Sequence, residues 1–89
     1  MASHFPLNHL DRAHEIGNRA TALRDRCSAM KDANPEIRVS KAERAIDHAI
    51  AQICRAYESM MMSDNDRDFY LELAEIDLDR ADELLNTAA

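Results

Sequence analysis

Residues 40–62 read SKAERAIDHAIAQICRAYESMMM, and this stretch decides the fold. Small or apolar residues recur in it at alternating spacings of four and three, namely Ala42, Ile46, Ala49, Ile53, Ala56 and Met60. Because an α-helix turns once every ~3.6 residues, that spacing places an apolar stripe along one side of a helix. Ser40 and Glu43 match a capping box, in which Ser40 accepts a hydrogen bond from the amide of residue 43. We therefore predict a helix over residues 41–62.

The preceding segment shows the same alternation and predicts a helix over residues 6–32. Its apolar series is Ala13, Ile16, Ala20, Leu23, Cys27 and Met30. Asn34 would end this helix, because the residue before a proline is pushed out of the α region. Gly17 interrupts the pattern, and we expect it to let another helix approach closely. In the connection, Ile37 and Val39 are expected to pack over the end of the bundle.

The last third of the chain predicts a helix over residues 64–86, with Ser63 or Asp64 as its N-cap. It carries two apolar series. One consists of Phe69, Leu73 and Ile76, and the other of Leu71, Ala74, Leu78, Ala81 and Leu85. Their centres lie more than about 100° apart around a helix, which is too wide an arc for one neighbour. Either this helix packs against both others, or part of it meets another chain.

The composition also favours helices. Glycine occurs once and proline twice in 89 residues, and alanine, leucine, glutamate, arginine and methionine are abundant. We predict one domain, residues 1–89, with an all-α fold: a small antiparallel three-helix bundle with coiled-coil-like packing. Five large apolar residues are expected in its core: Leu23, Ile46, Ile53, Leu73 and Ile76.

Charge is distributed unevenly along the chain. The net charge is −6, but residues 1–33 carry +1, residues 34–62 carry 0 and residues 63–89 carry −7. No basic patch is apparent in this distribution, so we expect no direct nucleic-acid binding and no membrane binding. A protein partner with a basic surface is the electrostatically favoured one. The chain shows no signal peptide and no long apolar run, and the expected location is the cytoplasm.

The acidic excess is concentrated in one pattern at spacings of four and three. It consists of Asp68, Glu72, Glu75, Asp79 and Asp82, which we call the acidic stripe. Like charges at these spacings cost a helix a few tenths of a kcal/mol each, which indicates either a solvated face or a docking face. A docking face would leave the stripe exposed, with no Lys or Arg from the other helices neutralising it.

Catalytic and cofactor-binding motifs are missing from the sequence. No glycine-rich phosphate loop, nucleophile elbow or HExxH pattern occurs, so we expect neither an enzyme nor a cofactor. His4, His9 and His14 are five residues apart, whereas helical zinc sites use spacings of three or four. Cys27, Cys54 and the methionines form no CxxC or MxxM array, so no metal site is predicted either.

Three functional hypotheses remain. The leading one is a non-enzymatic protein–protein interaction module, in its sharpest form an acidic helical inhibitor or regulator. It would dock through the acidic stripe on the basic surface of a nucleic-acid-binding protein, as phage counter-defence proteins do. The alternatives are a self-associating structural adaptor or secretion chaperone, and a soft-metal-binding helical protein. We also predict a homodimer, with these interface residues: Tyr70, Leu71, Leu78, Leu85, Met61 and Met62.

Overall fold

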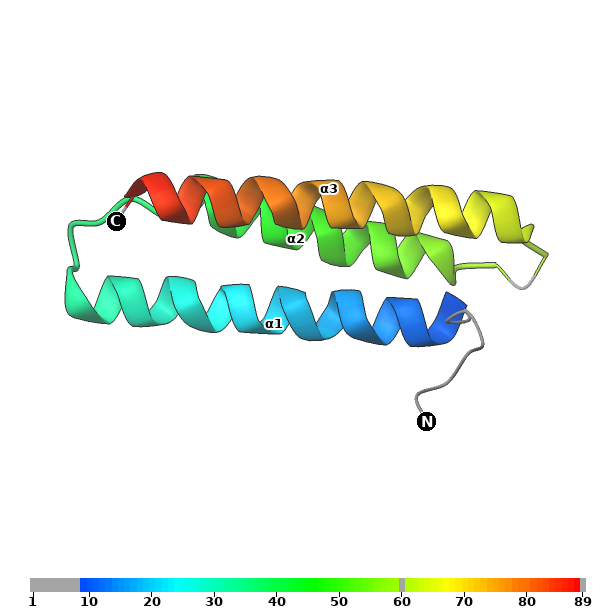
Figure 1. Cartoon of the computed structure of the whole chain (residues 1–89), viewed down its shortest axis with the longest axis horizontal. Coiled ribbons are helices and arrows are strands. Elements are labelled where there is room, and N and C mark those ends of the chain that lie inside the picture. The colour runs from blue at the N-terminus through cyan, green and yellow to red at the C-terminus, as the bar shows by residue number, and fades with distance from the viewer. Residues whose placement is uncertain (1–8, 60, 89) are drawn as a thin grey trace, which may run out of the picture.

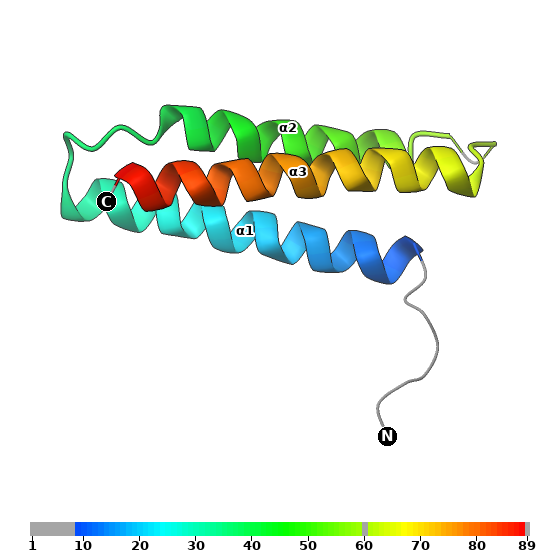
Figure 2. The same ribbon diagram turned by 45° about the horizontal axis from the view of Figure 1, so that its top comes forward.

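The computed structural model describes residues 9–59 and 61–88. These residues form three helices: α1 (His9–Ala33), α2 (Ser40–Ala56) and α3 (Asp64–Ala88). Figures 1 and 2 show the helices side by side, with α1 and α3 running in one direction and α2 in the other. The all-α three-helix bundle predicted from the helical periodicity is confirmed. Residues 6–8, the predicted start of the first helix, lie outside the described residues.

The connection from α1 to α2 has the predicted form. Helix α1 ends at Ala33, immediately before Asn34 and Pro35. The side-chain oxygen of Asn34 accepts a hydrogen bond from the amide of Glu36 at 3.2 Å, which closes a turn after the helix. Val39 is buried, and the half-buried Ile37 packs against the same core. Both residues thus cover one end of the bundle, as the sequence predicts.

Helix α2 begins where predicted, but the capping box is wrong. Val39 is the N-cap residue and Ser40 the first helical residue, and no side chain caps this end. The carboxylate of Glu43 instead binds Nζ of Lys31 at 2.8 Å, because α1 lies within reach. At the start of α3, by contrast, the hydroxyl of Ser63 accepts a hydrogen bond from the amide of Asp66 at 3.1 Å. The predicted N-cap at Ser63 is therefore confirmed.

Helix α2 ends at Ala56, six residues before the predicted position. At this end Nε of Arg67, a residue of α3, donates a hydrogen bond to the carbonyl oxygen of Ala56 at 2.8 Å. The guanidinium of Arg67 also lies 5.1 Å from the centre of the Tyr57 ring. A side chain from the next helix thus satisfies a carbonyl that a helix end leaves open. Periodicity alone could not reveal that contact.

The core is rich in alanine, which lets α2 and α3 pack closely along their length. Half of the buried hydrophobic residues in the described chain are alanines: Ala13, Ala20, Ala42, Ala45, Ala49, Ala56, Ala74 and Ala81. The largest fully buried side chains are Ile46, Leu71, Leu78 and Leu85, with Cys27 beside them. Helix α3 packs more extensively against α2 than against α1. Six of the eight alanines lie on α2 and α3, in keeping with that difference.

The predicted core residues have mixed outcomes. Leu23 and Ile46 are buried, and Ile53 and Leu73 are half-buried. The prediction for Ile76 is wrong, because 56% of this residue is exposed. The expected close approach at Gly17 is also wrong: a Cβ atom added there would meet nothing within 4 Å.

Candidate functional site

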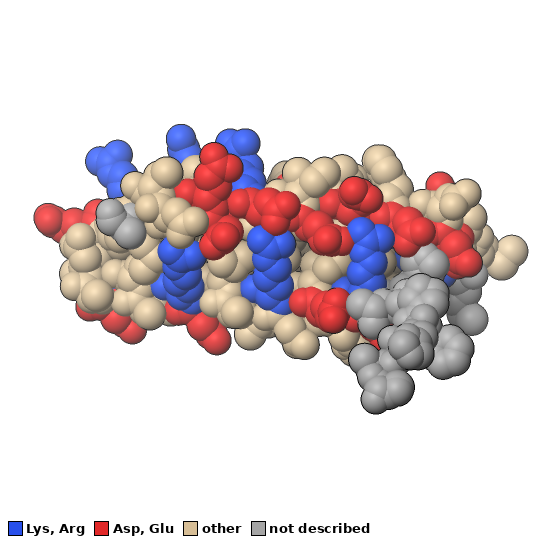
Figure 3. Space-filling model, in the orientation of Figure 1, with Lys and Arg blue, Asp and Glu red and all other residues tan. Residues whose placement is uncertain are grey.

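The acidic stripe lies along the seam between α1 and α3, where arginines from α1 face it. Arg12, Arg19 and Arg26 are spaced seven residues apart, and this spacing keeps them on one side of a helix. Figure 3 shows basic side chains reaching from α1 to the row of carboxylates on α3. We call these three arginines and the carboxylates that they bind the arginine ladder.

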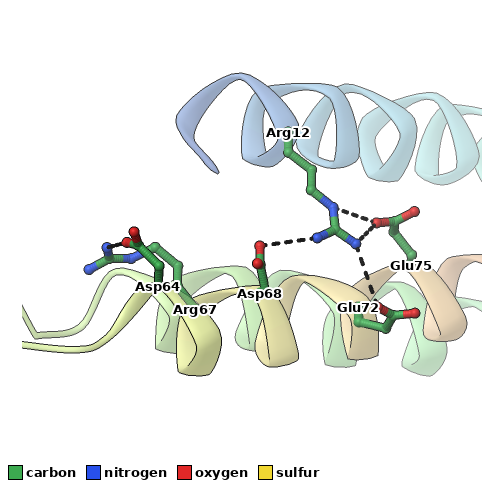
Figure 4. A network of polar contacts seen from close by, with 6 residues as sticks. All are labelled: Arg12, Asp64, Arg67, Asp68, Glu72 and Glu75. Atoms are coloured by element: carbon green, nitrogen blue, oxygen red, sulfur yellow. Dashed lines mark hydrogen bonds and ion pairs between the residues drawn. The ribbon is translucent and has the colours of Figure 1, made fainter. Parts of the chain in front are cut away.

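Arg12 binds three carboxylates of the stripe at once (Figure 4). Its Nε donates a hydrogen bond to Oε1 of Glu75 at 2.8 Å, and Nη2 contacts the same oxygen. Nη1 lies 3.3 Å from Oδ1 of Asp68, and Nη2 lies 3.9 Å from Oε2 of Glu72. The hydrogen bond to Glu75 raises the pKa of the Arg12 guanidinium, with a further contribution from the other carboxylates. This cation offsets the repulsion among three neighbouring acids.

The other two arginines repeat the arrangement along the seam. Nη2 of Arg19 lies 2.7 Å from Oδ1 of Asp79, and Nη1 of Arg26 lies 2.8 Å from Oδ1 of Asp82. Nη2 of Arg26 also donates a hydrogen bond to Asn86 at 2.7 Å. Because α1 and α3 are parallel, equal spacing on the two helices brings each arginine to its own group of acceptors.

The condition set for a docking face, that no Lys or Arg neutralises the stripe, is therefore not met. All five carboxylates of the stripe form ion pairs with arginines of α1: Asp68, Glu72, Glu75, Asp79 and Asp82. Two of them still present most of their side chain to solvent: Glu72 is 69% exposed and Asp79 is 70% exposed. The stripe is thus a structural seam on one flank and a charged surface on the other.

The two apolar series of α3 have roles opposite to those predicted. Leu71, Leu78 and Leu85 are fully buried in the single chain, so they have no surface left for a second copy. Their assignment to a self-association interface is wrong, because the helix turns them toward α1 and α2. Tyr70 is half-buried and packs against this core as well.

The other series forms the side of α3 that faces solvent. Phe69 is 59% exposed and Ile76 is 56% exposed, with the half-buried Leu73 between them. We call Phe69, Leu73 and Ile76 the outer face. Three exposed carboxylates lie along one border of it, on the same helix: Glu72, Asp79 and Glu83. The sequence revealed this apolar series, but it did not reveal which series the bundle buries.

The methionine segment between α2 and α3 is only partly described. Met61 is 92% exposed and Met62 is half-buried, while Met60 lies outside the described residues. Both described methionines lie in the connection rather than on α2, because that helix ends at Ala56. Nothing in their surroundings distinguishes them as a self-association site.

The thiols and histidines do not assemble into a metal site in the described chain. No three His, Cys, Asp or Glu side chains in residues 9–59 and 61–88 are placed to share a metal ion. Both cysteines are free, Cys27 being buried and Cys54 exposed. Burial raises the pKa of the Cys27 thiol, with a smaller contribution from Glu43, so the group is protonated and unreactive at neutral pH. His4 lies outside the described residues, and His14 is exposed.

Comparison of this chain with known protein families, with curated proteins and with solved structures finds no match. No helix in the described part of the chain has the length and apolar character needed to span a membrane.

Proposed function

We propose that this protein is a non-enzymatic protein-binding module that docks through the outer face of α3. The observation that carries the proposal is the exposure of Phe69 and Ile76, one heptad apart on a helix whose core-facing leucines are fully buried. Large apolar side chains at the centre and charged groups at the rim are the usual arrangement of a protein–protein interface. Leu73 lies between them and extends the apolar centre.

The rim charges favour a partner that is basic around an apolar patch. Glu72, Asp79 and Glu83 border the outer face on one side and remain exposed. Complementary charge across an interface chiefly raises the association rate and the specificity. In its sharper form, this proposal makes the protein an inhibitor or regulator of a nucleic-acid-binding protein, acting in the cytoplasm as phage counter-defence proteins do. Glu72, Asp79 and Glu83 would then meet the basic groups that otherwise contact phosphates.

Self-association through the same face is a second candidate, and one observation favours it. Asp66 and Arg80 lie seven residues before and seven residues after Leu73, on the same helix. If two copies of α3 packed antiparallel about Leu73, Asp66 of each copy would face Arg80 of the other. A two-fold interface of this kind must be self-complementary, and this spacing satisfies that condition. The adaptor hypothesis then survives with a different interface from the one that the sequence predicts.

The experiment begins with capture of the partner. A photoreactive phenylalanine analogue at position 69 would be crosslinked in an extract of the native host, and the captured protein would then be purified. Binding to that purified protein is measured with Phe69→Ser/Ile76→Ser, which we expect to weaken it at least tenfold. The matched control is Leu10→Ser, because Leu10 is also 56% exposed but lies on α1. Unchanged binding by the double variant would contradict the proposal.

Charge and self-association are tested separately. Glu83→Lys should slow association with the captured partner while leaving the fold intact, and added salt should weaken wild-type binding. Glu83 is chosen over Glu72 and Asp79, because Glu72 binds Arg12 and Asp79 binds Arg19, and reversing either carboxylate would disturb the seam. Sedimentation velocity of the wild type and of Phe69→Ser/Ile76→Ser decides the second candidate. A dimer that the double variant converts to a monomer supports it, and a strict monomer at high micromolar concentration contradicts it.

A further inference from the structure

The cations of this protein fall into two groups that differ in their partners. The first group forms ion pairs with carboxylates. It comprises every Lys and Arg of α1 together with Arg67 of α3: Arg12, Arg19, Arg24, Arg26, Lys31 and Arg67. Five others have no carboxylate partner among the described residues: Arg38, Lys41, Arg44, Arg55 and Arg80. In a chain with a net charge of −6, acids outnumber bases, so cations without partners are unexpected.

Four of these five cations line one groove between the start of α2 and the second half of α3. Lys41, Arg44 and His48 lie on one side of α2 at spacings of three and four, and Arg80 of α3 lies across from them around a hollow of about 400 Å³. Arg38 lines an adjoining hollow of about 380 Å³, which shares Lys41 and Arg44 with the first. Figure 3 shows Lys and Arg side chains along the upper edge of the molecule, toward the end where α3 finishes.

The charge balance of this groove is positive. Asp77 is the one carboxylate that lines the larger hollow, where three cations and His48 face it. The acids of α2 that could have compensated lie on the side toward α1, where Asp47 binds Arg24 and Glu43 binds Lys31. The expectation that no basic patch exists is therefore wrong. It rested on net charge along the chain, whereas the helix sorts cations to one side and carboxylates to the other.

We propose that this groove binds a small molecule carrying two or more phosphate groups. A guanidinium group can donate two parallel hydrogen bonds to a phosphate. Arg44 and Arg80 supply guanidinium groups from two different helices. Lys41 and His48 are seven residues apart, or about 10 Å along the axis at ~1.5 Å per residue, so the row of donors on α2 is longer than a single phosphate group. The hollow has a volume of about 400 Å³ and is open to solvent, so charge rather than enclosure would hold the ligand. A long polyanion is disfavoured, because the carboxylates of α3 would repel its ends.

The test is a titration with tripolyphosphate followed by amide chemical shifts and by calorimetry at low salt. We expect shifts confined to the neighbourhood of Lys41, Arg44, His48 and Arg80. Lys41→Gln and Arg44→Gln should each lower the affinity at least fivefold. Arg55→Gln is the matched control. Arg55 lies on the same helix, two turns beyond His48, and has no carboxylate partner in residues 9–59 and 61–88, so its replacement should change the affinity less than twofold. Equal losses in all three variants, or no shifts at millimolar tripolyphosphate, would overturn the proposal.

Two further probes define the ligand. Tighter binding of ATP than of tripolyphosphate would identify the ligand as a nucleotide. Equal affinities would show that the phosphate chain alone is recognised. Both results support a ligand with two or more phosphate groups. A single-stranded oligonucleotide that binds more tightly than either would show a nucleic-acid surface and overturn the small-ligand proposal. Phe69→Ser/Ile76→Ser should leave tripolyphosphate binding unchanged, which keeps this site distinct from the outer face.

Discussion

At the scale of single residues, Gly17 stands out because its surroundings do not require a glycine. It lies within α1, its backbone is helical, and an added Cβ would contact nothing within 4 Å. Glycine in a helix interior is less favourable than alanine by about 0.8–1.0 kcal/mol, since it loses more backbone freedom on folding.

We therefore expect Gly17→Ala to stabilise the protein by about 0.5–1 kcal/mol. For a domain of this size, that gain corresponds to a rise in Tm of several degrees, about 4–8 °C per kcal/mol. Thermal unfolding followed by circular dichroism measures it. A lower Tm would mean that another helix does approach Gly17 closely in solution, as the sequence first indicated.

The residues of the arginine ladder show how far sequence reasoning reaches at this scale. The acidic stripe was visible because its five carboxylates repeat at helical spacing within one segment. Its partners Arg12, Arg19 and Arg26 also repeat every seven residues, but this repeat alone assigned them no role. What the sequence could not provide was the rotation of α1 about its axis, which decides whether those arginines face α3. The cationic groove escaped prediction for a related reason, since its residues come from two helices.

At the scale of elements, the helix ends separate what local chemistry determines from what tertiary contacts determine. Ser63 acts on an amide three residues away, and its role followed from sequence. Arg67 belongs to α3 and donates a hydrogen bond to the last carbonyl of α2, so the sequence did not predict that α2 ends at Ala56. The two apolar series of α3 are a similar case: their existence follows from periodicity, but the choice of the buried one depends on the other two helices.

The two serines at helix starts give a matched pair of variants. Ser63→Ala removes a side-chain cap and should cost about 0.5–2 kcal/mol of stability. Ser40→Ala removes no cap, because Val39 occupies that position, and should change stability by less than about 0.5 kcal/mol. Urea unfolding of both variants measures the difference. A larger loss for Ser40→Ala than for Ser63→Ala would restore the capping box at α2.

At the scale of the whole molecule, the bundle has two different kinds of contact between its helices. Alanines line the faces of α2 and α3 and let these helices pack over a long interface. Helix α1 adds apolar residues to the same core, but long arginine side chains connect it to α3 along the seam. Its attachment should consequently depend more on ionic strength than the contact of α2 with α3 does.

Arg12→Gln tests that dependence. The variant leaves three neighbouring carboxylates without their cation, and we expect it to lose about 1 kcal/mol of stability at low salt. In 1 M salt the Debye length falls to about 3 Å, and most of this loss should disappear. Arg55→Gln has the same charge change without a carboxylate partner among the described residues, and it should be nearly neutral at both salt concentrations. An equal loss for Arg12→Gln in low and high salt would show that the arginine stabilises through packing instead.

The arginine ladder also bears on how α1 is aligned along its neighbours. Both its charges and its buried residues repeat every seven positions, so a shift of one heptad, about 10.5 Å, would place Arg19 where Arg12 lies and Leu23 where Ile16 lies. Two of the three arginine–carboxylate contacts would survive such a shift. The pattern along α1 therefore leaves its register ambiguous, and the connection resolves it through the turn at Asn34 and the buried Val39. Inserting flexible residues between Asn34 and Val39 would allow α1 to adopt a second alignment against its neighbours.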